Sequence, residues 1–302
     1  MTARKNVLIQ HQSGLSLVEL MIAMALGLVL TLGVTRLFMD SLQSKNAQHE
    51  LNTVNDGGRV VMNLMRQDLL RAGFKGCATD VTLGSYDAAT SANDIADAVE
   101  MQSQIDKLND GISTPATDLA SNLHAASDSI EIVYLRPFPR AGSNRISVSN
   151  TTVTLREPSP DPDPAVDQNT ITRVIGSNTT LFIGNCTRLE VAKLASDTTV
   201  GATTLTIKKA LKEDFGDSDI LLYEGVYRNY SIGKENAADP FGLFVGPDRL
   251  INNAAALTSK ANKILSVEQS GDAFTITLGL NNTGSDYQKT FATTVTRRNV
   301  VQ

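Results

Sequence analysis

The chain has 302 residues, of which 41% are hydrophobic and 20% are charged, and its formal net charge at pH 7 is −5. These are ordinary values for a water-soluble domain, so any membrane-spanning element has to be confined to one part of the chain. The negative net charge, together with only 5% aromatic residues and no tryptophan, argues against direct binding of nucleic acid.

The first segment is a short polar stretch followed by an apolar run. Residues 1–14 contain Arg4 and Lys5 as their only charged side chains, and residues 15–39 are apolar apart from a few positions. About 25 such residues are enough to cross a membrane as a helix. Basic residues before the span keep the N-terminus in the cytoplasm and send the rest of the chain across. We therefore expect a single membrane span.

A secretory signal peptide and an uncleaved signal anchor are the two alternatives for this segment. A secretory signal peptide would end in a small-x-small cleavage site, and Ala23-Met24-Ala25 has those residue types. The apolar run continues well past them, however, whereas such a site belongs at the end of the run. Hydropathy alone does not exclude the uncleaved signal anchor.

Glu19 distinguishes this span from an ordinary anchor. A carboxylate inside an apolar span costs on the order of 3 kcal/mol, so it needs a partner. If the chain is cleaved after Gly14, Leu15 gains a free amino group and Glu19 becomes the fifth residue of the new chain. The first and fifth residues of a helix lie on one face. A neighbouring helix, shifted along its axis, could then set its terminal ammonium against this carboxylate and neutralise both charges.

The stretch Gly14-Leu15-Ser16-Leu17-Val18-Glu19-Leu20 resembles the signal of type IV pilins and of the pseudopilins of type II secretion. The resemblance implies cleavage by prepilin peptidase between Gly14 and Leu15. It also implies N-methylation of Leu15 and a role for Glu19 in assembly and recruitment. The usual first residue of the mature chain in this family is phenylalanine, and Leu15 departs from that pattern.

The helical pattern continues beyond the apolar run. Apolar residues recur at spacings of three and four: Leu42, Leu51, Val54, Val61, Leu64, Met65 and Leu69. We expect one long helix within residues 15–75, from about Ser16 to Ala72, with its second half against a globular domain. Gly57-Gly58 predicts a bend or local melting, and Gly73 predicts the end of the helix.

The charged residues near the end of this helix, Arg66, Asp68 and Arg71, are expected to form a solvated face with local ion pairs. The alternative is that they order the junction between helix and domain or face neighbouring subunits.

A second resemblance lies in residues 59–77, which end in Asp-Leu-Leu-Arg-Ala-Gly-Phe-Lys-Gly-Cys. This stretch is similar to the end of the first helix in PilW-type minor pilins. Residues 294–299 resemble the terminal strand of that group and of J-type pseudopilins, and Gly76-Cys77 with a second cysteine favours the PilW type. The resemblance implies a minor pilin that acts with other minor pilins, the major pilin and the inner-membrane assembly platform to prime or cap filament assembly.

The two cysteines, Cys77 and Cys186, are most simply interpreted as one disulfide in an exported chain, with two buried free thiols as the alternative. A bond closing a loop of about 110 residues would contribute about 4–5 kcal/mol in the chain-entropy model. Such a bond implies an oxidising compartment, which here means the periplasm or beyond.

Residues 76–302 are expected to form a β-rich globular region. Within it, residues 78–128 are rich in Ala, Ser, Thr, Asn and Asp, which predicts a variable, exposed and mobile insertion with one short helix near residues 95–108. Strands are predicted at 130–135, 146–155, 171–175, 181–183, 204–208, 220–224, 227–232, 264–267, 273–280 and 291–295. No regular helices separate these strands, so an antiparallel sheet and a type IV pilin-like α+β fold are expected.

The sequence contains no motif that indicates an enzyme, a cofactor or a metal site. The three histidines, His11, His49 and His124, lack metal-ligand spacing. Asp217 and Asp219 precede a strand, where a turn accounts for them. The proline-rich stretch 158–164 with Asp167 could suggest a calcium loop, but alternating prolines favour an extended exposed loop.

Together these features predict a minor pilin that is first inserted in the bacterial inner membrane, with a periplasmic body, and is then assembled into the pilus, at its tip. A J-type pseudopilin of a type II secretion system is the first alternative. A membrane-anchored periplasmic binding module or adhesin that never enters a filament is the second.

Overall fold

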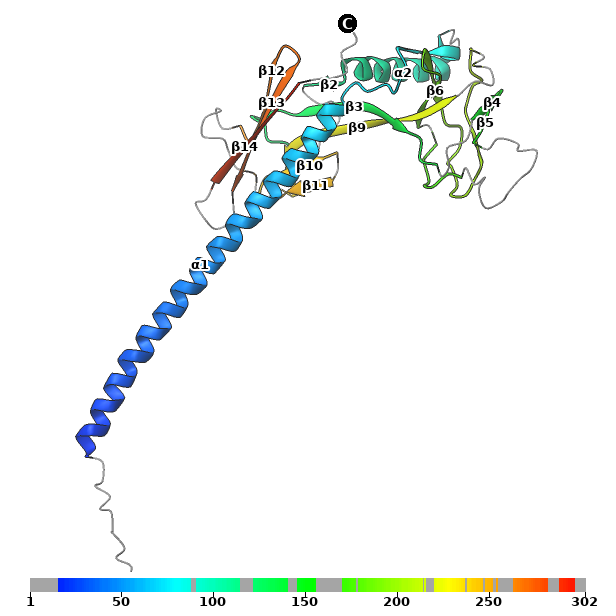
Figure 1. Ribbon diagram of the computed structural model, residues 1–302. Helices are drawn as coiled ribbons and strands as arrows, with labels where there is room; N and C mark the ends of the chain where they lie inside the picture. Colours follow the sequence, from blue (N-terminus) through cyan, green and yellow to red (C-terminus); the bar gives the residue numbers. More distant parts are fainter. Residues whose placement is uncertain are drawn as a thin grey trace, which may run out of the picture. The chain divides into compact units, whose positions relative to one another are not determined.

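The computed structural model describes residues 16–296, except for 88–90, 115–121, 141–145, 156–169, 178, 214, 216–219, 237, 247, 252–253, 255–262 and 282–287. The chain divides into two compact units, Met1–Thr53 and Val54–Gln302. The first contains the apolar half of a long helix, and the second contains the rest of that helix and a β-rich region (Figure 1). The predicted α+β fold of the type IV pilin kind is thereby confirmed. The proline-rich stretch 158–164, Asp217 and Asp219 lie outside the described residues.

Helix α1 extends from Leu17 to Arg71 and continues through Gly57 and Gly58, so the local melting predicted there does not occur. Gly58 has a packing role instead, because the Phe291 ring occupies the space that a side chain at this position would need. After α1 ends, Gly73 adopts a φ of +70°, a conformation that favours glycine and stops a helix as predicted. The Gly73 N–H donates to the carbonyl of Val133 at 2.8 Å, which joins the helix end to the sheet.

The largest sheet has eight strands, and its longest strand, β9 (Leu221–Gly233), lies at its centre. β3 (Ile130–Pro137) pairs along one side of β9, and β6 (Thr180–Gly184) and β10 (Gly242–Val245) share the other side. β7 (Arg188–Lys193) pairs with β6. The remaining strands lie toward the margins: β1 (Asp80–Thr82), β2 (Ile112–Ser113) and β11 (Asp248–Ile251). The β1–β7 pair is parallel, so the expectation of a purely antiparallel sheet needs this correction.

Two smaller sheets complete the β structure. One consists of β12 (Leu265–Ser270), β13 (Ala273–Asn281) and β14 (Gln288–Thr296). The other consists of β4 (Ser147–Ser149), β5 (Thr152–Thr154) and β8 (Thr204–Thr206). The two strands predicted at 220–224 and 227–232 are one continuous strand, β9. Residues 171–175 form an isolated bridge at Ile171 and no strand.

Helix α2 (Ala92–Asp110) belongs to the segment that was expected to be an exposed insertion. The Ser91 side chain caps it by accepting from the N–H of Asp94. Met101, Ile105 and Leu108 are fully or nearly fully buried and pack with sheet residues such as Phe182. Their spacing of three and four is a helical core pattern, which the polar composition of the segment obscured. This part of the chain therefore contributes to the core.

The second half of α1 shares a hydrophobic core with strands of two sheets. Val61, Met65 and Leu69 belong to one cluster with residues of β3, β9, β10, β12, β13 and β14. Two further clusters lie around β4–β8 and around α2. The half of α1 that was predicted to lie against a globular domain does so.

Asp68 lies inside this interface and is 4% exposed. Its carboxylate accepts hydrogen bonds from the hydroxyls of Tyr134 at 3.1 Å and Tyr230 at 2.6 Å. The interpretation of Asp68 as part of a solvated face is therefore wrong. Burial raises the pKa of the Tyr230 phenol far above its usual range, and the bond to Asp68 raises this pKa further, so the phenol stays a neutral donor. The guanidinium of Arg71 stacks over the Tyr134 ring at 5.9 Å.

Replacing Asp68 with alanine is expected to destabilise the globular unit, because two buried hydroxyls lose their acceptor. The expected loss is about 1–3 kcal/mol of unfolding free energy. The measurement is proteolysis of the full chain across a urea series. Asp56→Ala is the matched control, since Asp56 is exposed on the same helix. Equal stability of the two variants would contradict the role assigned to Asp68.

Candidate functional site

The apolar half of α1 is exposed along its described length. Large apolar side chains from Leu17 to Met39 are about half to three-quarters exposed, with Leu17 at 74% and Leu37 at 71%. By length and composition this helix could cross a membrane, and it is the one such helix among the described residues. A continuous apolar surface of this kind is unfavourable in water and needs lipid or other helices around it.

Glu19 is the one charged side chain between Ser16 and Arg36, and it lies in the first turn of α1. The side chain is exposed and has no hydrogen-bond or ion-pair partner among the residues the structure describes. The helix dipole favours a carboxylate at this end by about 0.3–1 kcal/mol. That is less than the roughly 3 kcal/mol cost of the charge in an apolar medium, so a cation from another molecule or from the chain's own N-terminus is needed.

Small residues follow Glu19 at intervals of four: Ala23, Gly27, Thr31 and Thr35. The hydroxyl of Thr31 donates to the carbonyl of Gly27 at 2.7 Å, and that of Thr35 donates to the carbonyl of Thr31 at 2.8 Å. These bonds satisfy both hydroxyl donors within the helix, which suits an apolar surrounding. Nothing lies within 4 Å of the position of a side chain at Gly27. Another helix can approach closely along such a ridge.

The family comparison supplies the decisive observation for this helix. The chain carries the prokaryotic N-terminal methylation motif. Residues 9–35 match the model of that motif, a segment that includes Gly14, Leu15 and Glu19. The match supports a type IV pilin-like protein, either a pilin or a pseudopilin, and implies processing by prepilin peptidase followed by filament assembly. Together with the apolar helix, it supports a membrane-anchored pilin. No curated protein and no solved structure matches this chain.

Some of the site residues predicted from the sequence lie in the described part of the chain, and others lie outside it. Gly14 and Leu15 lie outside the described residues, as do His11 and the C-terminal Arg297 to Asn299. Glu19 stands at the start of α1. His49 is exposed on α1, and His124 lies edge-on to the Phe241 ring. No group of three or more metal-ligand side chains occurs among the described residues.

Cys77 and Cys186 form the predicted disulfide, with Cα atoms 4.7 Å apart. Cys77 follows α1 by six residues, and Cys186 lies in the turn between β6 and β7. Gly76 has a φ of +71°, and the Tyr223 ring fills the space where a side chain at this position would lie. The Gly-Cys pair therefore lets the chain turn tightly against β9 and reach the β6–β7 turn.

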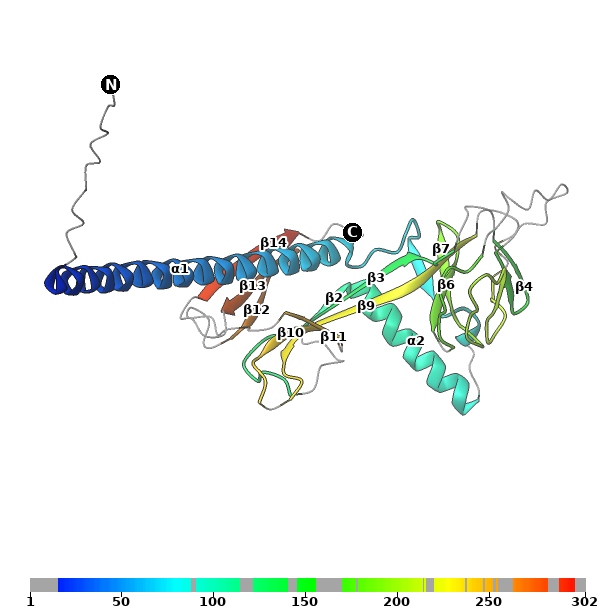
Figure 2. The same ribbon diagram turned by 90° about the horizontal axis from the view of Figure 1, so that it is seen from below.

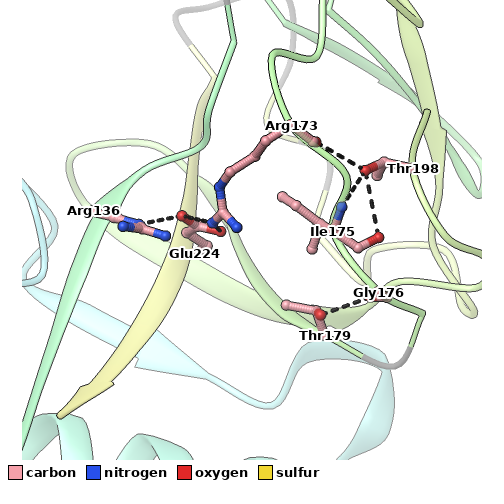
Figure 3. Close-up of polar contacts among 7 residues, drawn as sticks. All are labelled: Arg136, Arg173, Ile175, Gly176, Thr179, Thr198 and Glu224. Atoms are coloured by element: carbon pink, nitrogen blue, oxygen red, sulfur yellow. Dashed lines mark hydrogen bonds and ion pairs between the residues drawn. The ribbon is translucent and has the colours of Figure 1, made fainter. Parts of the chain in front are cut away.

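Glu224 is a buried carboxylate that sequence reasoning missed (Figure 3). It lies on β9 between the guanidinium groups of Arg136, on β3, and Arg173, in the segment before β6. Glu224 is 4% exposed at its side chain, and both arginines are nearly half exposed. Both partners come from segments distant in sequence, so spacing alone gives no signal for this cluster. It joins three segments and leaves no free carboxylate for chemistry.

Cys186→Ser is expected to lower the unfolding free energy by about 2–5 kcal/mol, with the chain-entropy value at the upper end, because the unfolded chain is no longer cross-linked. The urea midpoint of the full chain measures this change. The same fall should appear when the unmodified chain is reduced, and the variant should not respond to the reductant. A variant that unfolds at the same midpoint as the unmodified chain would contradict a stabilising role for the bond.

Proposed function

We propose that this chain is a PilW-type minor pilin of a type IV pilus. Residues 1–14 are the leader, which prepilin peptidase removes, and Leu15 is then N-methylated. Residues 15–39 hold the protein in the inner membrane, and residues 76–302 lie in the periplasm. The protein then joins other minor pilins and the major pilin at the assembly platform and primes or caps the filament. It thereby supports motility, adhesion or DNA uptake.

The observation that carries this proposal is Glu19, a carboxylate without a partner among the described residues, on an exposed apolar helix inside a matched methylation motif. A soluble domain would gain nothing from this helix, and a simple anchor would gain nothing from the charge. Both features make sense where several such helices pack side by side away from water.

The position of Glu19 suggests how neighbouring helices would align. Cleavage before Leu15 places a positive amine four residues before Glu19, and methylation leaves that amine protonated. Four residues of α-helix correspond to an axial distance of about 6 Å. A neighbouring helix displaced by that distance brings its terminal amine level with Glu19. The ridge of small residues that begins at Ala23 allows the two backbones to approach closely beside this ion pair.

Choice of the PilW type over a J-type pseudopilin rests on weaker support. It comes from the resemblance of residues 59–77 to the end of the first helix in PilW-type proteins, and from the cysteine of that stretch forming a disulfide. A J-type pseudopilin would use the same helix in a short periplasmic filament. Neighbouring genes distinguish the two, since other minor pilins with a tip adhesin favour a pilus and secretion components favour a pseudopilus.

The first test is the mass of the N-terminus in cells that assemble the filament. The mature chain is expected to begin with N-methylated Leu15. Gly14→Glu is expected to leave the leader attached, because the peptidase requires the small residue before the cleaved bond. If the unmodified chain keeps Met1, the proposal is excluded. Such an uncleaved and unmethylated chain would favour the alternative of a membrane-anchored binding module.

Glu19→Gln is expected to leave cleavage unchanged and to reduce incorporation into filaments at least tenfold, which corresponds to a loss of about 1.4 kcal/mol. The amide keeps the shape of the side chain but cannot pair with an ammonium. The amount of the chain in sheared filaments, relative to its amount in the membrane, measures this effect. Asp40→Asn is the matched control, because Asp40 is exposed on the same helix. Equal incorporation of both variants would rule out the role proposed for Glu19.

A further inference from the structure

The sheet formed by β12, β13 and β14 has two edges, and Asp128 covers the first half of the β12 edge. The N–H of Val267 donates to the carboxylate of Asp128 at 2.9 Å, and the carbonyl of Leu265 accepts from the N–H of Asp128 at 3.0 Å. Lys263 holds Asp128 in place through an ion pair at 2.7 Å. Asp128 thus occupies the edge at Leu265 and Val267, so a further strand cannot pair along this half of β12.

The outward groups of β14 follow from the hydrogen-bond pattern of its neighbour. The N–H of Gly279 donates to the carbonyl of Ile264, so the odd-numbered residues of β13 face β12 and the even-numbered ones face β14. Ile276 is opposite Thr293, which makes the odd-numbered residues of β14 the ones that bond to β13. The even-numbered residues point their N–H and C=O groups outward, and after Gln288 at the start of the strand these are Thr290, Ala292, Thr294 and Thr296.

These outward groups belong to an open edge, with β14 as the outermost strand of its sheet (Figure 2). On the side of β14 that faces away from β13, the backbone N–H and C=O groups of these four residues have no backbone hydrogen-bond partner among the described residues. Their side chains are exposed, whereas Val295 on the other face is buried.

Other strand edges in the described structure are protected in ways that β14 is not. The marginal strands β1, β2, β4 and β8 have two or three residues, and β11 has four, two of them charged. β14 has nine residues, no proline, and Lys289 as its one charged side chain. Proteins usually shorten, charge or cover such an edge because it invites another strand to pair.

We propose that β14 pairs with an extended segment of a neighbouring pilin-like subunit, which adds a strand to this sheet. The proposal rests on the proposed function for the identity of the partner. Backbone groups at the edge provide the affinity, as in other cases of strand addition. The incoming segment is expected to carry uncharged or acidic residues near Lys289 and β-branched residues opposite the exposed threonines, because such pairs stabilise neighbouring strands.

A second copy of β14 is a poor occupant. Antiparallel pairing of two copies requires a twofold axis normal to the sheet, which reverses every direction within the plane of the sheet. The second half of α1 packs against this sheet, so within such a pair the two copies of this half would run in opposite directions. Two chains anchored through the same end in one membrane cannot adopt that arrangement.

The test uses the full chain in cells that assemble the filament. A photoreactive benzoylphenylalanine replaces Thr290 at the edge, and a separate chain carries it in place of Thr206, an exposed threonine on β8, as the control position. The expected result is an adduct from position 290, and not from 206, with another chain that has its own prepilin motif. Mass spectrometry of the adduct identifies that chain.

Three substitutions at Ala292 then test whether pairing depends on the strand edge. Ala292→Pro removes an outward N–H without removing a bond to β13 and should lower the adduct yield at least about tenfold. Ala292→Lys keeps the N–H but charges the edge and should also lower it. Ala292→Thr changes the side chain alone and should leave the yield unchanged. The Lys variant keeps the test valid if the Pro variant is degraded.

Each other result overturns the pairing. An adduct with a second copy of this chain would contradict it. So would an adduct yield that Ala292→Pro and Ala292→Lys leave unchanged, and so would the absence of any adduct from a chain whose Leu15 is methylated. The N-terminal mass separates this failure from failure of the proposed function. A chain that keeps its leader overturns the filament role and the partner together, whereas a processed chain without an adduct overturns the strand pairing alone.

Discussion

The hydrogen bonds from Tyr134 and Tyr230 to Asp68 connect the helix to the two longest strands of the main sheet. Tyr134 lies on β3 and Tyr230 on β9, so one carboxylate of α1 fixes its rotation relative to both. Without these two donors the buried carboxylate would keep unsatisfied acceptors, at a cost of about 1–3 kcal/mol. The register of α1 on the sheet is therefore specified by polar geometry, and the surrounding cluster of apolar residues supplies most of the burial.

Helix α1 carries a second carboxylate that matters for function, Glu19 in its first turn. The two carboxylates serve different environments, however. Asp68 is satisfied inside its own chain, whereas Glu19 has no partner among the described residues. One carboxylate thus stabilises the fold, and the other is left for the ion pair proposed above.

Sequence reasoning worked well where a residue was unfavourable in its local context. The methylation motif around Glu19 was recognised and is matched, Gly73 ends a helical pattern, and two cysteines in an exported chain suggest a bond; each conclusion needs only nearby residues or composition. It worked poorly for Asp68 and Glu224, which look like surface charges until segments more than fifty residues away bring tyrosines or arginines against them. Strands β7, β10 and β11 were missed for the same reason, because strand formation depends on pairing partners that local propensity does not contain. Helix α2 was underestimated because alanines and polar residues surround its buried stripe.

Besides stabilising the fold, the disulfide changes how the chain would respond to a pulling force. In the proposed filament, a pulling load between α1 and a point of the chain beyond Cys186 would follow the backbone past Arg71 to Cys77, six residues later. The covalent bond passes that load directly to the turn that holds Cys186, 109 positions further along the chain. The enclosed segment, which would otherwise be able to lengthen by roughly 370 Å when drawn out, stays outside the path of the force. Helix α2, strands β1 to β6 and their cores can therefore keep their shape while the subunit is under tension.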